Sequence, residues 1–76
     1  MGEEDFLVEL GGRIRSQRKR IGQTQEALAL AAGLDRSYYG AVERGERNIT
    51  FKVLCRVCLA LKCDVAGLTS GIPQIS

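Results

Sequence analysis

Apolar residues recur every three or four positions at the start of the chain, which is the spacing of one face of an α-helix. The recurring residues are Phe6, Leu7, Leu10, Ile14 and Ile21. They predict an amphipathic helix from about Glu4 to Arg20. Arg18 continues the apolar row four residues after Ile14, so its guanidinium needs a partner. Gly11 and Gly12 weaken such a helix by about 0.5–1 kcal/mol each relative to alanine, and close approach of another helix would account for them.

Two short helical segments follow, and a glycine joins them. Thr24 is a suitable N-cap for a helix from Gln25 to Ala32, and Gly33 suits the left-handed backbone that often ends a helix. Asp35 is a suitable N-cap for the next helix, which runs to about Arg44. The core contacts expected from these segments are Leu28, Leu34, Tyr39 and Val42.

The segment at about residues 24–44 therefore has the pattern of a helix-turn-helix unit. Small or apolar residues occupy the positions where its two helices must touch, and polar residues occupy the first turn of the second helix. The usual partner of such a unit is the major groove of double-stranded DNA.

The rest of the chain predicts two further helices and a tail. A polar loop from Glu46 to Ile49 leads to Thr50, a suitable N-cap for a fourth helix. The buried stripe expected on this helix is Phe51, Leu54, Cys55, Cys58 and Leu61. Asp64 is a suitable cap for a short fifth helix from Val65 to about Ser70, and we expect the tail, residues 71–76, to be flexible.

The length of the chain suits one domain, so residues 1–76 are predicted to form a single all-α, compact five-helix fold. A charged fraction of 26% beside a hydrophobic fraction of 45% is typical of a soluble globular protein. No apolar run approaches the roughly 20 residues that span a bilayer, and the acidic start lacks the positive segment of a secretory signal. We therefore expect a cytoplasmic protein that does not bind membranes.

The net charge of +2 does not by itself indicate a nucleic-acid partner, but the positive charges are clustered. No acidic residue occurs between Leu10 and Gln25. The basic residues of this interval are Arg13, Arg15, Arg18, Lys19 and Arg20. Such a cluster forms either a positive face that attracts phosphate or an ordinary solvated helix face.

Several stretches match the pattern of one family of DNA-binding proteins. They are TQEALA in the second helix, Gly33 at the turn, VERGERN at the end of the third helix and LALKCDVAGL in the closing helix pair. From Ile14 to Leu68 the chain thus resembles the Cro/CI-type phage repressor (lambda-repressor-like) family, whose fold is a compact five-helix domain. In that family an arginine of the first helix pairs with a glutamate at the end of the third. The matching residues here are Arg18 and Glu43, and we expect them to form a partly buried bidentate ion pair.

A longer stretch, LDRSYYGAVERGERNIT, resembles the small stand-alone controller proteins of restriction–modification systems. Similar stretches also occur in other small Cro/CI-type regulators, so both interpretations stay open. Either resemblance implies a transcription regulator that binds double-stranded DNA in a sequence-specific way.

The resemblance places the base contacts on the first turns of the third helix, at Arg36, Ser37 and Tyr38. Arg36 can donate two hydrogen bonds to guanine O6 and N7, the commonest specific pairing. Ser37 can bond a base or a phosphate, and Tyr38 can pack on a thymine methyl or bond a phosphate. Gly40 and Ala41 are expected to face the same way without a polar side chain, which shifts specificity toward DNA shape.

Phosphate contacts are implied by position at Thr24, Gln25, Arg47 and Asn48. Exposed helix N-termini would add amide donors for the phosphates. Structural roles compete with these assignments: Arg36 could be an ordinary exposed helix residue, and Thr24 and Asp35 could serve only as caps. Tyr39 is assigned to the core and not to the DNA.

One such domain buries too little DNA for tight specific binding, so we expect a homodimer on a palindromic operator. Its two recognition helices would lie roughly 34 Å apart, one turn of DNA. By analogy with family members that pair through their last helix, the apolar dimer patch is expected at Leu59, Val65, Leu68 and Ile72.

Three other classes of function compete with DNA binding. The chain has no histidine, no phosphate-binding glycine loop and no paired carboxylates on a pocket-like element, so we expect no enzyme, cofactor or small-molecule ligand. Cys55, Cys58 and Cys63, with Asp64 as a fourth ligand, would suit a metal or redox sensor. Three thiols fall short of a closed zinc site, however, and buried cysteines behave as small apolar residues. The last alternative is an antitoxin-like regulator whose tail binds another protein.

Overall fold

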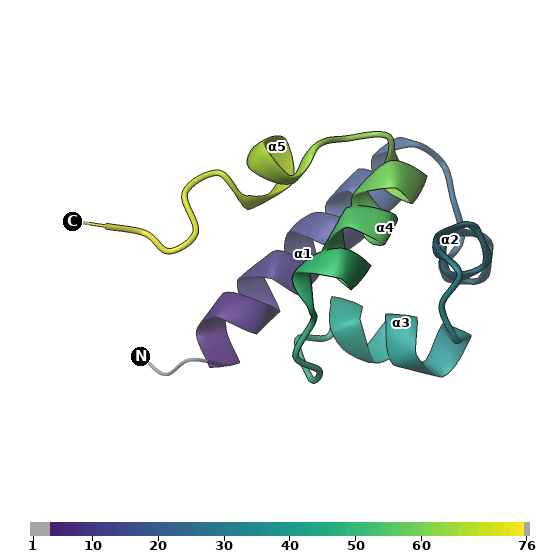
Figure 1. The fold of residues 1–76 in the computed structure, drawn as a ribbon, viewed down its shortest axis with the longest axis horizontal. Helices are drawn as coiled ribbons and strands as arrows, with labels where there is room; N and C mark the ends of the chain where they lie inside the picture. The colour runs from purple at the N-terminus through teal and green to yellow at the C-terminus, as the bar shows by residue number, and fades with distance from the viewer. Residues whose placement is uncertain (1–3, 76) are drawn as a thin grey trace.

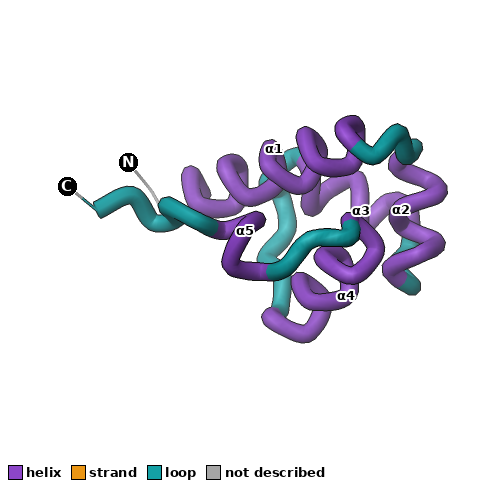
Figure 2. Tube along the Cα trace, turned by 90° about the horizontal axis from the view of Figure 1, so that it is seen from above, coloured by secondary structure: helices purple, strands orange, loops and turns teal. Residues whose placement is uncertain are grey.

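Five helices make up the part of the chain that the computed structural model describes, residues 4–75. They are α1 (Glu4–Arg20), α2 (Gln25–Ala32), α3 (Arg36–Glu43), α4 (Phe51–Leu61) and α5 (Val65–Thr69). In Figure 1, α1 crosses the molecule behind α4, with α2 and α3 on one side of this pair and α5 on the other. Since α1 contacts both α3 and α5, it forms the axis of the fold (Figure 2). The predicted all-α, five-helix fold is confirmed.

Each of the helices α2 to α5 begins directly after the residue that the sequence predicts as its N-cap. The caps are Thr24, Asp35, Thr50 and Asp64. In each case a side-chain oxygen accepts a hydrogen bond from the amide three residues further on, at 2.7–3.1 Å. The C-terminal ends are less predictable: α3 ends at Glu43 with Arg44 as its C-cap, and α5 ends at Thr69, before Ser70.

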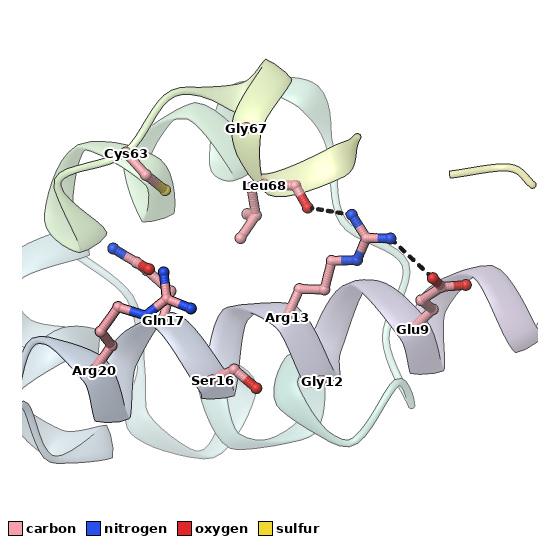
Figure 3. Close-up of a pocket in the computed structure, with 9 residues that line it drawn as sticks. All are labelled: Glu9, Gly12, Arg13, Ser16, Gln17, Arg20, Cys63, Gly67 and Leu68. Atoms are coloured by element: carbon pink, nitrogen blue, oxygen red, sulfur yellow. Dashed lines mark hydrogen bonds and ion pairs between the residues drawn. The ribbon is translucent and has the colours of Figure 1, made fainter. Parts of the chain in front are cut away.

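Hydrogen bonds from a side chain of α1 help to hold the end of α5. The guanidinium of Arg13 donates from Nη1 to the carbonyl oxygen of Leu68, at 3.1 Å, and from Nη2 to Glu9 (Figure 3). Nη1 also donates to the carbonyl oxygen of Ser70. Residues 71–75 then leave α5 without regular structure, and Ser76 lies outside the described residues. The flexibility of the tail stays a prediction.

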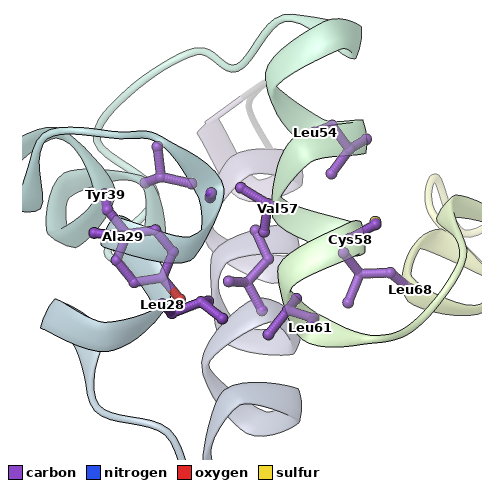
Figure 4. Close-up of a cluster of buried hydrophobic side chains, with 11 residues drawn as sticks. Leu28, Ala29, Tyr39, Leu54, Val57, Cys58, Leu61 and Leu68 are labelled. Carbon is purple, nitrogen blue, oxygen red and sulfur yellow. The ribbon is translucent and has the colours of Figure 1, made fainter.

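The core lies where α1, α2, α3 and α4 meet, and α5 closes one side of it (Figure 4). Its buried residues are Ile14, Leu28, Ala29, Ala32, Tyr39, Val42, Leu54, Val57, Cys58, Leu61 and Leu68. Three of the four core contacts predicted for the helix-turn-helix segment are among them, and Leu34 packs against them while partly exposed.

The buried stripe of α4 is rotated relative to the prediction. Phe51 is 71% exposed and Cys55 is half-buried, whereas Val57 is completely buried. The buried face therefore follows Leu54, Val57, Cys58 and Leu61, at i, i+3, i+4 and i+7. The prediction was wrong for Phe51 and Cys55 because apolar residues occur on two faces of α4, and spacing alone does not say which face meets the core.

The two glycines of α1 differ in what surrounds them. A methyl group on Gly11 would collide with the carbonyl oxygens of Val42 and Glu43, whereas one on Gly12 would meet open space. The close approach of another helix, proposed for both positions, is thus confirmed for Gly11 and wrong for Gly12. The missing side chain at Gly11 lets the end of α3 lie directly against α1.

Candidate nucleic-acid interface

The turn between α2 and α3 is fixed by hydrogen bonds at the end of α2. Gly33 has a left-handed backbone, with φ of 71°, which lets the chain reverse direction after Ala32. The amide of Leu34 then donates to the carbonyl oxygen of Ala29 at 2.8 Å. Only residues 33–35 separate the two helices, so the start of α3 is held firmly against the end of α2.

The first turn of α3 presents two exposed polar side chains, Arg36 and Ser37. Asp35 caps this turn by accepting a hydrogen bond from the amide of Tyr38 at 3.1 Å. Among the residues that the structure describes, no ion pair engages the guanidinium of Arg36. Two donor-bearing side chains thus project from a rigidly capped helix start toward solvent.

Tyr38 joins the first turn of α3 to the loop that follows the helix. Its ring packs against the core on one side, and the guanidinium of Arg47 lies 5.4 Å from the ring centroid. Its hydroxyl donates to the carbonyl oxygen of Asn48 over a long 3.4 Å. The structure therefore brings together three residues that the sequence analysis assigned to DNA, with a cation–π contact between two of them.

The phosphate candidates of α2 lie at the other end of α3. Thr24 is exposed, but its hydroxyl oxygen is occupied as the α2 cap. Gln25 is half-buried, and its Nε2 donates to Oε1 of Glu43 at 2.9 Å. Since α3 rises by about 1.5 Å per residue, this end lies about 10 Å from Arg36. The candidate phosphate contacts thus flank α3 at both ends.

The middle of α3 differs from the prediction, because Gly40 and Ala41 are both buried. A Cβ atom on Gly40 would lie 3.3 Å from Nη1 of Arg44 and 3.9 Å from Oε1 of Gln25, so these two long side chains cover the glycine. Ala41 lies beneath the following loop, whose Glu46 amide donates to its carbonyl oxygen at 2.9 Å. The expectation that Gly40 and Ala41 share an exposed reading face is wrong.

Arg44 is a candidate that the sequence reasoning missed. Its side chain is 58% exposed, lies over the backbone of Gly40 and forms an ion pair with Glu46 at 3.1 Å. The spacing of four residues between Gly40 and Arg44 is the signal that could have revealed it, because side chains at i+4 cover position i on a helix surface.

A buried ion pair anchors α3 to α1. Arg18 donates from Nε to Oε2 of Glu43 at 2.6 Å and from Nη2 to Oε1 at 3.1 Å, a bidentate arrangement. Arg18 is 8% exposed and Glu43 is 6% exposed. Nη1 of Arg18 also donates to the carbonyl oxygen of Gln23 at 2.9 Å, and the hydroxyl of Tyr39 donates to Oε2 of Glu43. The network thus joins α1, α3 and the start of α2.

The electrostatics of this network keep Glu43 ionised. Burial by itself would raise the pKa of Glu43, but hydrogen bonds from Arg18, Tyr39 and Gln25 outweigh burial and lower the pKa below its ordinary value. The hydrogen bond to Glu43 raises the pKa of Arg18. Burial, followed by the hydrogen bond to Glu43, raises the pKa of Tyr39. The i, i+4 spacing of Tyr39 and Glu43 could have revealed the hydroxyl contact, whereas no sequence signal marks Gln25.

The basic cluster of α1 is divided between structural and exposed residues. Arg18 is committed to the ion pair, and Arg13 to the end of α5. Arg15, Lys19 and Arg20 are exposed. The positive face available to a partner is therefore smaller than the sequence suggests.

The four residues predicted for a dimer patch do not form one exposed surface. Leu59 is 80% exposed, whereas Val65 and Ile72 are half-buried. Leu68 is 5% exposed and belongs to the core of the single chain, where it packs with Cys58 (Figure 4). The assignment of Leu68 to the dimer patch is wrong, because α5 needs this side chain to dock on the rest of the domain.

The three cysteines are free thiols. Within residues 4–75, no cluster of three histidine, cysteine, aspartate or glutamate side chains is placed to hold a metal ion. None of the helices in this described range has the length and apolar character needed to cross a membrane.

Comparison with known proteins finds relatives that span most of the chain. Residues 14–68 match the helix-turn-helix family. The control protein C.SmaI of Serratia marcescens is 42% identical over 64 residues, which cover 84% of this chain and 76% of that protein. The crystal structure of the restriction-modification controller protein C.AhdI from Aeromonas hydrophila has a TM-score of 0.80 at 44% identity, and the match covers 82% of this chain and 94% of that one.

A third relative has been seen with DNA. The structure of the restriction-modification controller protein C.Esp1396I, as a tetramer in complex with its natural 35 base-pair operator, has a TM-score of 0.80 at 30% identity. The match covers 91% of each chain. The resemblance drawn from the sequence is confirmed, and the chain belongs to the Cro/CI-type helix-turn-helix family, among the control proteins of restriction–modification systems.

Proposed function

We propose that this protein is a transcription regulator that binds double-stranded DNA in a sequence-specific way and controls a restriction–modification system. The observation that carries the proposal is the capped, exposed first turn of α3, with Arg36 and Ser37 facing solvent and Tyr38 joined to Arg47. This turn is the part of a helix-turn-helix unit that meets base edges in the major groove. The proposed role is binding, without catalysis, and the proposed location is the cytoplasm.

In the proposed complex, Arg36 donates two hydrogen bonds to guanine O6 and N7. Ser37 bonds a base or a phosphate beside it. Tyr38 contacts a thymine methyl with its ring, while its hydroxyl keeps donating to the carbonyl oxygen of Asn48 and Arg47 stays over the ring. Because Tyr38 is already fixed by two neighbours, little side-chain freedom is lost on binding.

Phosphate contacts hold the helix in register from both of its ends. Thr24 and Gln25 offer the amides at the start of α2, where a helix N-terminus attracts anions. Arg47 and Asn48 offer a charge and an amide at the other end of α3. Arg44 joins this set, since its guanidinium lies over the centre of α3 and needs only to release the exposed Glu46.

Two copies of the domain on a palindromic operator would place two α3 helices about 34 Å apart. C.Esp1396I occupies its operator as a tetramer, and the same principle of repeated subunits is proposed here. The dimer patch is proposed at Leu59, Val65 and Ile72, which retain exposed surface once Leu68 is assigned to the core.

Selection of binding sites from a library of random duplexes tests the function. The wild-type chain should enrich a palindrome, whereas the double variant Arg36→Ala, Ser37→Ala should enrich none while keeping its helical circular dichroism. Failure of the wild type to enrich any motif would overturn the proposal. Co-purification of an unrelated protein under the same conditions would instead favour the antitoxin-like alternative.

A further inference from the structure

The junction between α4 and α5 brings two thiols together. The chain leaves α4 through Lys62, whose backbone is left-handed with φ of 59°. The amide of Lys62 donates to the carbonyl oxygen of Leu59 at 3.2 Å, and the amide of Cys63 donates to that of Cys58 at 3.1 Å. This pair of hydrogen bonds is the Schellman motif, in which a contact often forms between the side chains at the two positions that Cys58 and Cys63 occupy here.

The two thiols differ in their access to solvent. Cys63 is half-buried and points into the cleft of about 710 Å³ between α1 and α5, above Gln17 (Figure 3). Cys58 is 3% exposed and lies beside Leu68 in the core (Figure 4). Burial and then the neighbouring Cys63 thiol raise the pKa of Cys58 to about 12, so the two thiols are close enough to interact. A small reagent in the cleft therefore meets Cys63 and not the buried Cys58.

The third cysteine is less well placed for a disulfide. Cys55 and Cys58 are separated by one turn in the middle of α4, where Cβ atoms at i and i+3 lie about 5–6 Å apart. A disulfide needs a Cβ–Cβ distance of about 3.5–4.5 Å. Bridging Cys55 to Cys58 would distort a regular helix, whereas the pair at the Schellman motif spans the end of the helix.

We propose that Cys63 and Cys58 form a thiol-oxidation site, in which a peroxide converts the pair into a disulfide within one chain. The sulfur of Cys63 attacks one peroxide oxygen, so that an S–O bond forms, the O–O bond breaks, and water leaves. The thiol of Cys58 then attacks the resulting sulfenic acid: an S–S bond forms, the S–O bond breaks, and the proton of Cys58 leaves with the second water. The two thiols lose two electrons, and the peroxide takes them up.

The disulfide acts on α5. In the reduced protein, the sulfur of Cys58 fills space beside Leu68, the residue that docks α5 on the core. Drawing this sulfur to bonding distance of Cys63 leaves part of that space unfilled and removes its van der Waals contacts. The helix α5 has only five residues and depends on this docking, so oxidation loosens it. This inference does not depend on DNA binding.

Mass spectrometry of the peroxide-treated full-length chain tests the site. Folded protein exposed to hydrogen peroxide should keep one free thiol of its three and lose the mass of two hydrogens. A proteolytic digest should contain a peptide cross-linked between Cys58 and Cys63, and dithiothreitol should remove the cross-link. Hydrogen exchange should become faster at the amides of α5 in the oxidised form and return to its former rate on reduction.

Two variants serve as controls. Cys55→Ser should form the cross-link as readily as the wild type, whereas Cys63→Ser should form none while keeping its helical circular dichroism. The proposal would be overturned by a cross-link that includes Cys55, by one between two chains, or by the absence of any cross-link. An unchanged exchange rate in α5 after complete oxidation would overturn the effect on this helix.

Discussion

The two ends of α3 differ in burial and in hydrogen bonding. At its C-terminal end, Glu43 is almost wholly buried, and four hydrogen bonds from Arg18, Tyr39 and Gln25 converge on its carboxylate. At its N-terminal end, Arg36 and Ser37 are exposed. The carboxylate at the C-terminal end has all its hydrogen-bond partners within the chain, whereas the N-terminal end presents hydrogen-bond donors to solvent.

This contrast shows how a small domain separates stability from recognition. A buried charge is tolerated only where every polar atom is paired, so the sequence at the anchored end is tightly constrained. The exposed side chains of Arg36 and Ser37 contribute little to folding and can change at little cost to the fold. Substitutions at the C-terminal end should therefore change the free energy of unfolding, and substitutions at the N-terminal end should change DNA binding. Variants at each end test whether these two effects are separate.

The largest effect is expected at the anchored end. Glu43→Ala removes the carboxylate and leaves the guanidinium of Arg18 buried without its partner. The free energy of unfolding should fall by about 3–5 kcal/mol, as measured by urea denaturation followed by circular dichroism. This loss is a large fraction of the stability of a domain of this size.

The exposed ion pair between Arg44 and Glu46 provides the matched control. Both side chains are 58% exposed, so Glu46→Ala should change the free energy of unfolding by about 0–1 kcal/mol. Similar losses in Glu43→Ala and Glu46→Ala would mean that burial is not what makes the anchor strong.

The anchor also gives the stability a dependence on pH. The pKa of Glu43 is lower in the folded chain than its ordinary value, so the carboxylate stabilises the fold above about pH 4.3, the value for an unperturbed glutamate. This contribution is lost as the pH falls through the folded pKa. Between pH 5 and pH 2 (roughly the range of carboxylate titration), the unfolding free energy of the wild type should fall more steeply than that of Glu43→Gln. Parallel pH profiles for the two proteins would contradict the assignment.

The packing of α1 against the end of α3 can be tested with two adjacent glycines. Gly11→Ala places a methyl group against the carbonyl oxygens of Val42 and Glu43, which should lower the free energy of unfolding by about 1–3 kcal/mol. Gly12→Ala meets open space, and its better helix propensity should raise the same quantity by about 0.5–1 kcal/mol. Thermal denaturation of both variants measures the difference, and changes of the same sign would contradict the close approach at Gly11.

At the exposed end, Arg36→Ala should leave the free energy of unfolding within about 0.5 kcal/mol of the wild type. On DNA it should cost about 1–3 kcal/mol and relax the preference at one base position in each half-site. Fluorescence anisotropy with a series of single-base operator variants measures both effects. Arg36→Lys should retain the charge but not the preference, because an ammonium group cannot donate in the bidentate geometry. An Arg36→Ala variant that unfolds easily would show that the two ends of α3 are not separate.

The sequence was sufficient for features that depend on local chemistry. Thr24, Asp35, Thr50 and Asp64 all cap the helices that they were expected to cap, because capping needs only an oxygen three residues before an amide. The pairing of Arg18 with Glu43 followed from an arginine on an apolar stripe together with the family resemblance, and the structure has that pair.

Features that depend on the relative rotation of helices were not accessible from spacing. Apolar residues occur on two faces of α4, one with Phe51 and the other with Val57. Only the packing of α1 and α2 against α4 decides that the face with Val57 enters the core. Leu68 carries no signal that separates docking within the chain from pairing between chains. Gln25 reaches Glu43 across two helices, an interaction that no local pattern encodes.

The smallest expected effect distinguishes the phosphate contacts from the base contacts. Arg47 lies over the ring of Tyr38, beside the first turn of α3, and is proposed to neutralise a phosphate. Arg47→Ala should weaken binding to every DNA sequence alike, and the slope of log K against log salt should become shallower by about 0.9 for each phosphate that the variant no longer neutralises. Arg36→Ala should instead change the sequence preference at one position.

Titrations at several salt concentrations, on the selected site and on unrelated DNA, separate the two outcomes. If Arg47→Ala altered the preference at a single base while the salt slope stayed constant, the guanidinium over Tyr38 would be a reader of sequence, and recognition would extend from α3 into the loop that follows it.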